Sequence, residues 1–180
     1  MRKLLWAEWR KLRRSSIILL TIFATVLIAV IVLVAGRETT VDGFYLSDGG
    51  WYMTMVQPWA TMFVLPAIIA MLGSYMICRE EQDDTLKSLL LIPVSETALT
   101  AAKMIVTFVI SVLIYLLLFV ITLSTELILH YSDLSIGMVL SFFKSYLLEG
   151  VGVFLAVSPI IAVVSYTKKS YWLALLLAEI

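Results

Sequence analysis

The sequence contains few of the residues that build disulfides, metal sites or nucleic-acid-binding surfaces. It has one cysteine, one histidine and 14% charged residues among 180. One cysteine excludes an internal disulfide, and a single histidine leaves little material for a metal site. The 13 basic and 13 acidic residues cancel, so the net charge does not predict binding to nucleic acid.

Motifs for nucleotide binding and nucleophilic catalysis are also missing. The sequence has no G-x-x-x-x-G-K-[ST] phosphate-binding loop and no H-E-x-x-H zinc motif. His130 stands beside Tyr131, which is typical of an interfacial position, and no Ser/His/Asp or Cys/His set can be assembled. We therefore expect that the chain is not an enzyme and has no catalytic residue, metal site or directly bound cofactor.

Apolar side chains, by contrast, are abundant. They make up 62% of the sequence, and the mean hydropathy is +1.02. Soluble domains have about 45–50% apolar residues. A chain of this size cannot bury the additional apolar side chains in its own core, so we expect a lipid bilayer to surround them. The expected fold is an all-α, polytopic membrane helix bundle that forms a single transmembrane domain over residues 1–180.

Four apolar stretches are long enough to cross a bilayer, which takes about 20 residues of helix. We predict spans at residues 17–35, 59–77, 104–123 and 147–164. A fifth segment, residues 171–180, reaches only about 15 Å as a helix. We interpret it as the start of a fifth span in a chain that is a fragment; the alternative is a last segment at the interface.

The outer segments between the spans have weaker patterns. Residues 36–58 form a loop whose aromatic residues are expected at the outer interface, and residues 133–146 are expected to form a short surface helix or a partly inserted hairpin. Glu149 is expected near the outer end of the fourth span. We favour local pairing with Lys144 or an interfacial position; the alternatives are a second protomer and a cationic substrate.

Prolines and small residues mark two further features of the spans. Pro66 and Pro159 predict kinks, either static bends, which we favour, or hinges. Ala70 and Ser74 have the spacing that allows two helices to approach closely, although such a pair also occurs by chance in apolar sequence.

Basic residues alternate strongly between the two sides of the membrane. The N-terminal tail, the loop between the second and third predicted spans and the segment after the fourth span carry eleven, and the opposite side carries only Arg37 and Lys144. Basic residues remain on the cytoplasmic side, so the N-terminus is predicted to be cytoplasmic. A cleaved signal peptide over residues 1–36 is the competing interpretation, but its apolar run is too long.

The N-terminal tail has its own amphipathic pattern. In residues 1–14, leucine and tryptophan residues recur at helical spacing with basic residues between them. This pattern predicts an interfacial helix along the inner headgroups. An ordinary basic flank with tryptophan anchors explains it equally well.

The cytoplasmic loop at residues 79–100 is the most unusual segment. Acidic residues at positions 80–84 (the acidic lead) are followed by leucine residues at helical spacing (the leucine stripe), which predict a short amphipathic helix. Pro93 ends this helix, and Ser95 can cap the next one. The stripe must be buried on lipid or on a partner. Interfacial helices that favour anionic lipid are usually basic, so the acidic lead favours a protein partner.

The loop has the residue order E-E-x-x-D-T-L-K-x-L-L-x-x-P-V-S-x-x-x-L-x-x-x-K, and a basic, tryptophan-containing N-terminal helix precedes it in the chain. This arrangement resembles permease subunits of the ABC-2 type, in the branch that handles lantibiotics and bacitracin. In that family this loop is the coupling helix, which seats in a cleft of the nucleotide-binding subunit. Asp84 and Glu96 depart from the residues frequent there. The resemblance implies partner contact by the following residues: Glu80, Glu81, Thr85, Leu86, Leu89, Leu90, Pro93 and Ser95.

The resemblance implies a membrane-spanning permease of an ATP-driven exporter of peptide antibiotics or other amphipathic compounds, in the bacterial cell membrane. Its partners would be a cytoplasmic ABC ATPase subunit, which would hold ATP and Mg, a second permease copy or paralogue, and the lipid bilayer. Members usually have six spans. The alternatives from other classes are a non-transporting membrane immunity or scaffold protein and an intramembrane enzyme.

Overall fold

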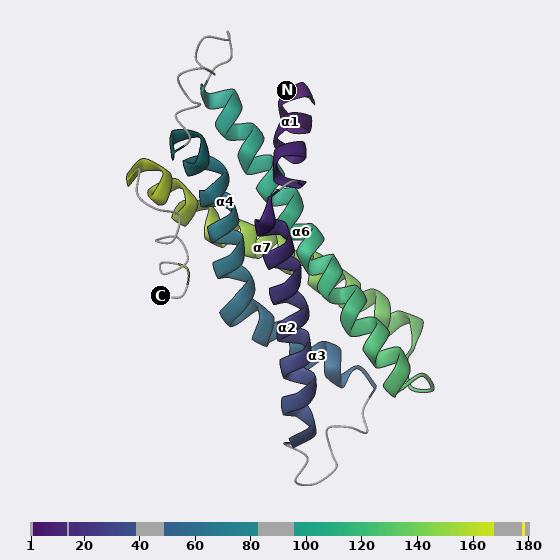
Figure 1. The fold of residues 1–180 in the computed structure, drawn as a ribbon. Coiled ribbons are helices and arrows are strands. Elements are labelled where there is room, and N and C mark those ends of the chain that lie inside the picture. Colours follow the sequence, from purple (N-terminus) through teal and green to yellow (C-terminus); the bar gives the residue numbers. More distant parts are fainter. Residues whose placement is uncertain (1, 14, 39–48, 83–95, 168–177, 179–180) are drawn as a thin grey trace.

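The computed structural model describes residues 2–13, 15–38, 49–82, 96–167 and 178, and these are helical except at residues 15, 49–50 and 130–135. The elements in chain order are α1 (Arg2–Arg13), α2 (Ser16–Glu38), α3 (Trp51–Trp59), the π-helical turn η1 (Ala60–Val64), α4 (Leu65–Gln82), α6 (Glu96–Leu129) and α7 (Ile136–Thr167) (Figure 1). No strand occurs in these residues. The predicted all-α class is confirmed.

Among the described residues, three helices are long and apolar enough to cross a membrane, namely Ser16–Gly36, Thr97–Leu129 and Ile136–Val164. A fourth span is formed if Trp51–Met62 and Leu65–Cys78, which meet at 46°, count as one bent helix. The protein is therefore a multi-pass membrane protein. Its helices satisfy their backbone hydrogen bonds internally, as a bilayer requires.

The second span is bent, and it begins earlier in the chain than expected. The helical segment begins at Trp51, so its first turns occupy residues that were expected to form a loop. Pro66, at the start of α4, lacks the N–H that would continue the α-helical ladder, and its ring crowds the preceding turn. Just before it the chain widens into η1, where the N–H of Leu65 donates to the carbonyl of Ala60. The kink expected at Pro66 is thus found, and a π-helical turn accompanies it.

The expectation for residues 133–146 is wrong. Instead of a separate surface helix or hairpin, α7 begins at Ile136 and continues without interruption to Thr167, past Pro159. Ser135 starts it, because its Oγ accepts a hydrogen bond from the N–H of Met138 at 3.2 Å, which is the geometry of a helix N-cap. The early start changes the position of Glu149, which now lies near the middle of a helix.

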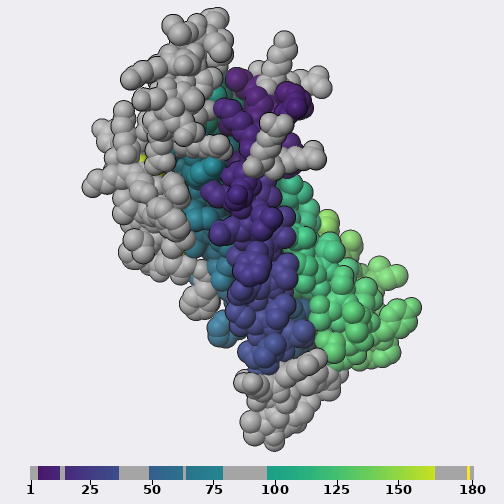
Figure 2. Space-filling model, viewed as in Figure 1, coloured from purple at the N-terminus to yellow at the C-terminus, as the bar shows by residue number. Residues whose placement is uncertain are grey.

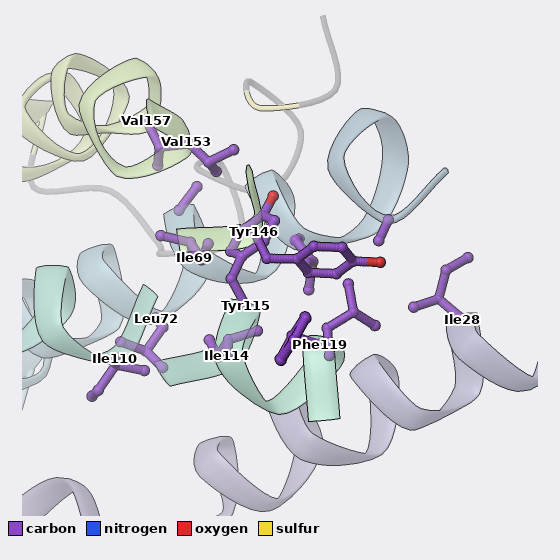
Figure 3. Packing of buried hydrophobic residues seen from close by; sticks show 14 of the residues in the cluster. Ile28, Ile69, Leu72, Ile110, Ile114, Tyr115, Phe119, Tyr146, Val153 and Val157 are labelled. Atoms are coloured by element: carbon purple, nitrogen blue, oxygen red, sulfur yellow. The ribbon is translucent and has the colours of Figure 1, made fainter. Parts of the chain in front are cut away.

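The core lies where α6 packs against α7 and α4. Tyr115 of α6 and Tyr146 of α7 are fully buried, and Figure 3 shows them among aliphatic side chains of several helices. The ring of Phe119 meets the ring of Tyr146 edge-on, with centroids 5.7 Å apart. Aromatic edge-to-face pairs of this kind add to the apolar packing.

The α2 helix lies on the surface of the bundle. Figure 2 shows it as a continuous ridge along one face, beside α6. Its exposed side chains are large and apolar, with Leu19 73% and Phe23 62% exposed. A ridge of this kind is suited to hydrocarbon, which explains why a helix with no charged residue before Arg37 remains so exposed.

The N-terminal helix α1 packs against α6. Leu12 and Glu8 are buried, and Glu8 forms an ion pair with Lys11 at 3.3 Å. Trp6 is 63% exposed, and the guanidinium of Arg10 lies over its ring at 5.0 Å. The interfacial position of this helix stays a prediction, since the packing on α6 does not place it relative to lipid.

Candidate functional site

The predicted coupling loop connects two helix ends that lie at the same end of the bundle. α4 ends at Gln82 and α6 begins at Glu96, close to α1 (Figure 1). Glu80 and Glu81 lie in the last turn of α4. The other six predicted contact residues lie outside the described residues: Thr85, Leu86, Leu89, Leu90, Pro93 and Ser95. Their role in partner contact stays a prediction.

The described residues contain a second candidate, a polar cluster between α3, η1, α6 and α7. We call it the Glu149 cluster, and its members are Gln57, Thr61, Tyr115, Ser145 and Glu149. Each member is held by a side-chain hydrogen bond to another member. Residues 57–61 and residues 145–149 are about 90 positions apart in the sequence, so only the fold brings them together.

Glu149 is the centre of this cluster. Its Oε1 accepts a hydrogen bond from Nε2 of Gln57 at 2.6 Å, and its Oε2 accepts one from Oγ1 of Thr61 at 3.0 Å. Nε2 of Gln57 also donates to Oγ of Ser145 at 2.8 Å. The hydroxyl of Tyr115 donates to Oγ1 of Thr61 at 3.1 Å. All four supporting groups are uncharged.

The expected pairing of Glu149 with Lys144 is not found. Within the described part of the chain Glu149 forms no ion pair, and Lys144 is exposed. Two of the cluster's members come from the bent span, with Gln57 in α3 and Thr61 in η1. Interrupted helices and π-turns are frequent at functional sites of membrane and soluble proteins. Glu149 was singled out from the sequence, but it lies near the middle of α7 and not near the end of a span, and its neighbours are Gln57 and Thr61 in place of Lys144.

A second buried carboxylate was missed. Glu126, near the end of α6, is completely buried. Its Oε1 accepts from the N–H of Gly50 at 2.6 Å, and its Oε2 accepts from the N–H of Tyr52 at 3.2 Å. Nδ1 of His130 lies 3.1 Å from its Oε1. The signal in the sequence was the spacing of Glu126 and His130, four residues apart on one helix face.

These bonds, together with two tyrosines, fix α3 within the bundle. The hydroxyl of Tyr52 donates to the carbonyl of Ala29 in α2 at 2.6 Å, and the hydroxyl of Tyr146 donates to the carbonyl of Met53 at 2.9 Å. Tyr52, expected at the outer interface, is instead 1% exposed. The start of α3 is therefore anchored to α2, α6 and α7, while the Glu149 cluster lies at its other end.

Comparison with known proteins identifies the family. The family described as ABC-2 family transporter protein matches residues 4–180. The bacitracin transport permease protein of Bacillus licheniformis is 34% identical over 102 residues, which are 57% of this chain and 49% of that protein. The match thus spans about half the length of this curated relative. No solved structure matches the chain. Because the family match covers nearly the whole sequence, the chain belongs to the ABC-2 transporter family.

Proposed function

We propose that this protein is the membrane-spanning permease subunit of an ATP-driven exporter of peptide antibiotics or other amphipathic compounds. The observation that carries the proposal is the family match over residues 4–180, and the similarity to a bacitracin transport permease supports the substrate class. The sequence has no phosphate-binding loop, so ATP and Mg belong to a separate nucleotide-binding subunit and the permease is not itself an enzyme.

The loop at residues 79–100 couples the permease to that subunit. It joins α4 to α6, the helices that surround the core together with α7, so a force on the loop acts on the whole bundle. The leucine stripe at Leu86, Leu89 and Leu90 supplies the apolar contact, and the acidic lead supplies charge complementarity. For ATP to drive transport, this contact must differ in strength between the open and closed states of the partner.

Placement and assembly follow from the same proposal. The N-terminus lies in the cytoplasm of a bacterial cell, because the basic tail lies at the same end of the bundle as the end of α4 and the beginning of α6, which the coupling loop joins (Figure 1). A second permease copy or a paralogue completes the translocation path. Rocking of the two bundles then exposes the substrate path outward.

Leu89→Glu tests the coupling contact. The tagged permease is co-expressed with the ATPase encoded beside it, and both co-purification and protection of cells against bacitracin are measured. We expect the variant to lose about tenfold or more of the co-purified ATPase, because a charge in an apolar contact costs at least about 1.4 kcal/mol. Ile136→Glu, at the opposite end of the bundle and 89% exposed, is the matched control and should retain both.

Two results contradict the proposal. If Leu89→Glu leaves co-purification and protection intact, the loop is not the coupling element. If protection persists when the hydrolytic glutamate of the partner ATPase is replaced, the protein is a non-transporting immunity or scaffold protein.

A further inference from the structure

We propose that the Glu149 cluster binds a positively charged group, an ammonium or guanidinium, of the compound that the permease moves. That the cation belongs to the cargo rests on the proposed function. The site itself rests on the contacts of Glu149, which is the acceptor of every hydrogen bond that reaches its carboxyl group within the described residues.

The carboxyl group is positioned but not neutralised. Its two oxygens each accept one hydrogen bond, from the amide of Gln57 and the hydroxyl of Thr61. A carboxylate has about four acceptor positions, so one position on each oxygen remains. An acidic side chain inside a span is costly without a cationic partner, and the described residues supply none. A cationic ligand would both fill the free positions and remove that cost.

Glu149 lies near the middle of its apolar helical segment. Residue 149 stands 13 residues after the first residue of the Ile136–Val164 segment and 15 before its last. Tyr115 likewise lies near the middle of its own helix, α6. Substrate sites of many transporters lie near the middle of the spans beside interrupted helices. The Glu149 cluster lies near the middle of the Ile136–Val164 segment and beside the interrupted second span.

A ligand can reach the carboxyl group from one side of α7. Glu149 is partly exposed, whereas Tyr146 and Gly150 beside it are buried against α6. One turn further along, a methyl group added at Gly152 would meet nothing within 4 Å, and Leu148 is 57% exposed. The carboxyl group therefore lies at the border between the packed face and an open face of the helix.

The cluster also connects the site to the bend. The acceptor lies on α7, and its two donors lie on α3 and η1. A change in the 46° bend would alter the hydrogen bonds of Gln57 and Thr61 to Glu149. The affinity for a cation would then differ between two shapes of the second span, which is what a transport cycle requires of a cargo site.

Photolabelling tests the site without the ATPase. The full chain is placed in vesicles of phosphatidylcholine and phosphatidylglycerol, which carry no primary amine. The probes are an alkyl diazirine with a terminal ammonium group and its hydroxyl counterpart, and adducts are mapped by mass spectrometry. We expect the ammonium probe to label residues 54–62 and 141–152 about tenfold more than the hydroxyl probe, and Glu149→Gln to reduce its labelling to the hydroxyl level.

Controls separate charge from structure. Lys144→Gln changes an exposed charge on the same helix and should leave labelling unchanged. In the wild type, where folding is not in question, dodecylammonium should displace the ammonium probe and dodecanol should not. Unchanged labelling of Glu149→Gln, or equal competition by dodecanol, overturns the proposal. A zero-length carbodiimide cross-link from Glu149 to a basic residue of a second copy also overturns it, because the cation would then belong to the permease itself.

The result is independent of the coupling experiment. If labelling depends on Glu149 but the ATPase never co-purifies, the cation site stands and the proposed function fails. If the ATPase couples but the ammonium probe shows no preference, the exporter proposal stands and this site fails.

Discussion

Glu126 links the end of α6 to the beginning of α3. The first backbone N–H groups of a helix have no partner inside the helix and carry a partial positive charge. Here the carboxyl group of Glu126 accepts from the N–H groups of Gly50 and Tyr52. Gly50 has a φ of 91°, a left-handed conformation that glycine adopts without strain. Glu126, 76 positions away in the sequence, thus accepts the hydrogen bonds that a neighbouring N-cap side chain usually accepts.

We predict that Glu126→Ala destabilises the protein. Two buried N–H groups lose their acceptor and water cannot replace it, so the free energy of unfolding should fall by about 2 kcal/mol. Glu126→Gln should lose less, because the amide oxygen still accepts one of the bonds. The measurement is reversible denaturation in mixed micelles, followed by circular dichroism.

Ser124→Ala is the control for this change. Ser124 lies on the same helix and its exposed hydroxyl donates only to the carbonyl of Val120, so its loss should change stability by less than about 0.5 kcal/mol. Equal stability of Glu126→Ala and Ser124→Ala would mean that the cap contributes nothing.

Single residues were predictable from the sequence only where their partners lie nearby in the chain. Glu149 was recognised, because an acidic residue in an apolar run is conspicuous. Gln57 and Thr61 were not, because their partner lies 92 and 88 positions away. Glu126 was missed because the predicted span ended at residue 123, three positions before it.

At the scale of helices, α6 and α7 approach closely at Gly150. A methyl group added there would lie 3.1 Å from the Cα of Val112, and the hydroxyl of Ser111 donates to the carbonyl of Gly150 at 2.8 Å. A second close approach is at Gly73 in α4, where the added methyl would overlap Cδ1 of Ile161. Small residues at helix crossings allow such close approaches in membranes, where van der Waals packing, in place of the hydrophobic effect, holds helices together.

We predict that Gly150→Leu and Gly152→Leu have opposite consequences. The first must separate α7 from the backbone of α6 and should lower the free energy of unfolding by about 1–3 kcal/mol. The second enters open space and should be neutral or slightly stabilising, because leucine favours helix over glycine by about 0.8 kcal/mol. Unfolding in mixed micelles compares the two. Equal losses would show that α6 and α7 do not cross at Gly150.

The position of a helix could be predicted from the sequence where the length of an apolar stretch alone determines it. α2 covers the expected residues 17–35 with a few more at its end. The start of α6 agrees with the helix expected after Ser95, but α6 continues six residues past the expected end at residue 123. α7 begins 11 residues before the expected start at residue 147, because polar residues were taken as span boundaries although a helix can continue through them. The 46° bend was signalled by Pro66, but the π-turn beside it depends on packing that a sequence does not reveal. Ala70 and Ser74 proved to be fully buried, in the helix that also carries Gly73.

At the scale of the whole molecule, the described helices have two chemically different ends. α1, the end of α4 and the beginning of α6 lie at one end (Figure 1). The end of α2, the beginning of α3 and the turn between α6 and α7 lie at the other. The alternation expected from the basic residues agrees with the chain's path, and the proposed cytoplasmic N-terminus would place the first end in the cytoplasm. This assignment can be tested directly.

We predict that Thr100 and Ser132 are reached from opposite sides of the membrane. Both are exposed, Thr100 in the first turns of α6 and Ser132 in the turn before α7. Each is replaced by cysteine in a Cys78→Ala background, which removes the protein's single native cysteine. A membrane-impermeant maleimide should label Ser132→Cys in intact cells and Thr100→Cys only after permeabilisation. The Cys78→Ala parent should not react. The reverse pattern would place residues 79–100 outside the cell, where no cytoplasmic ATPase could bind them, and the coupling proposal would then fail whatever the family.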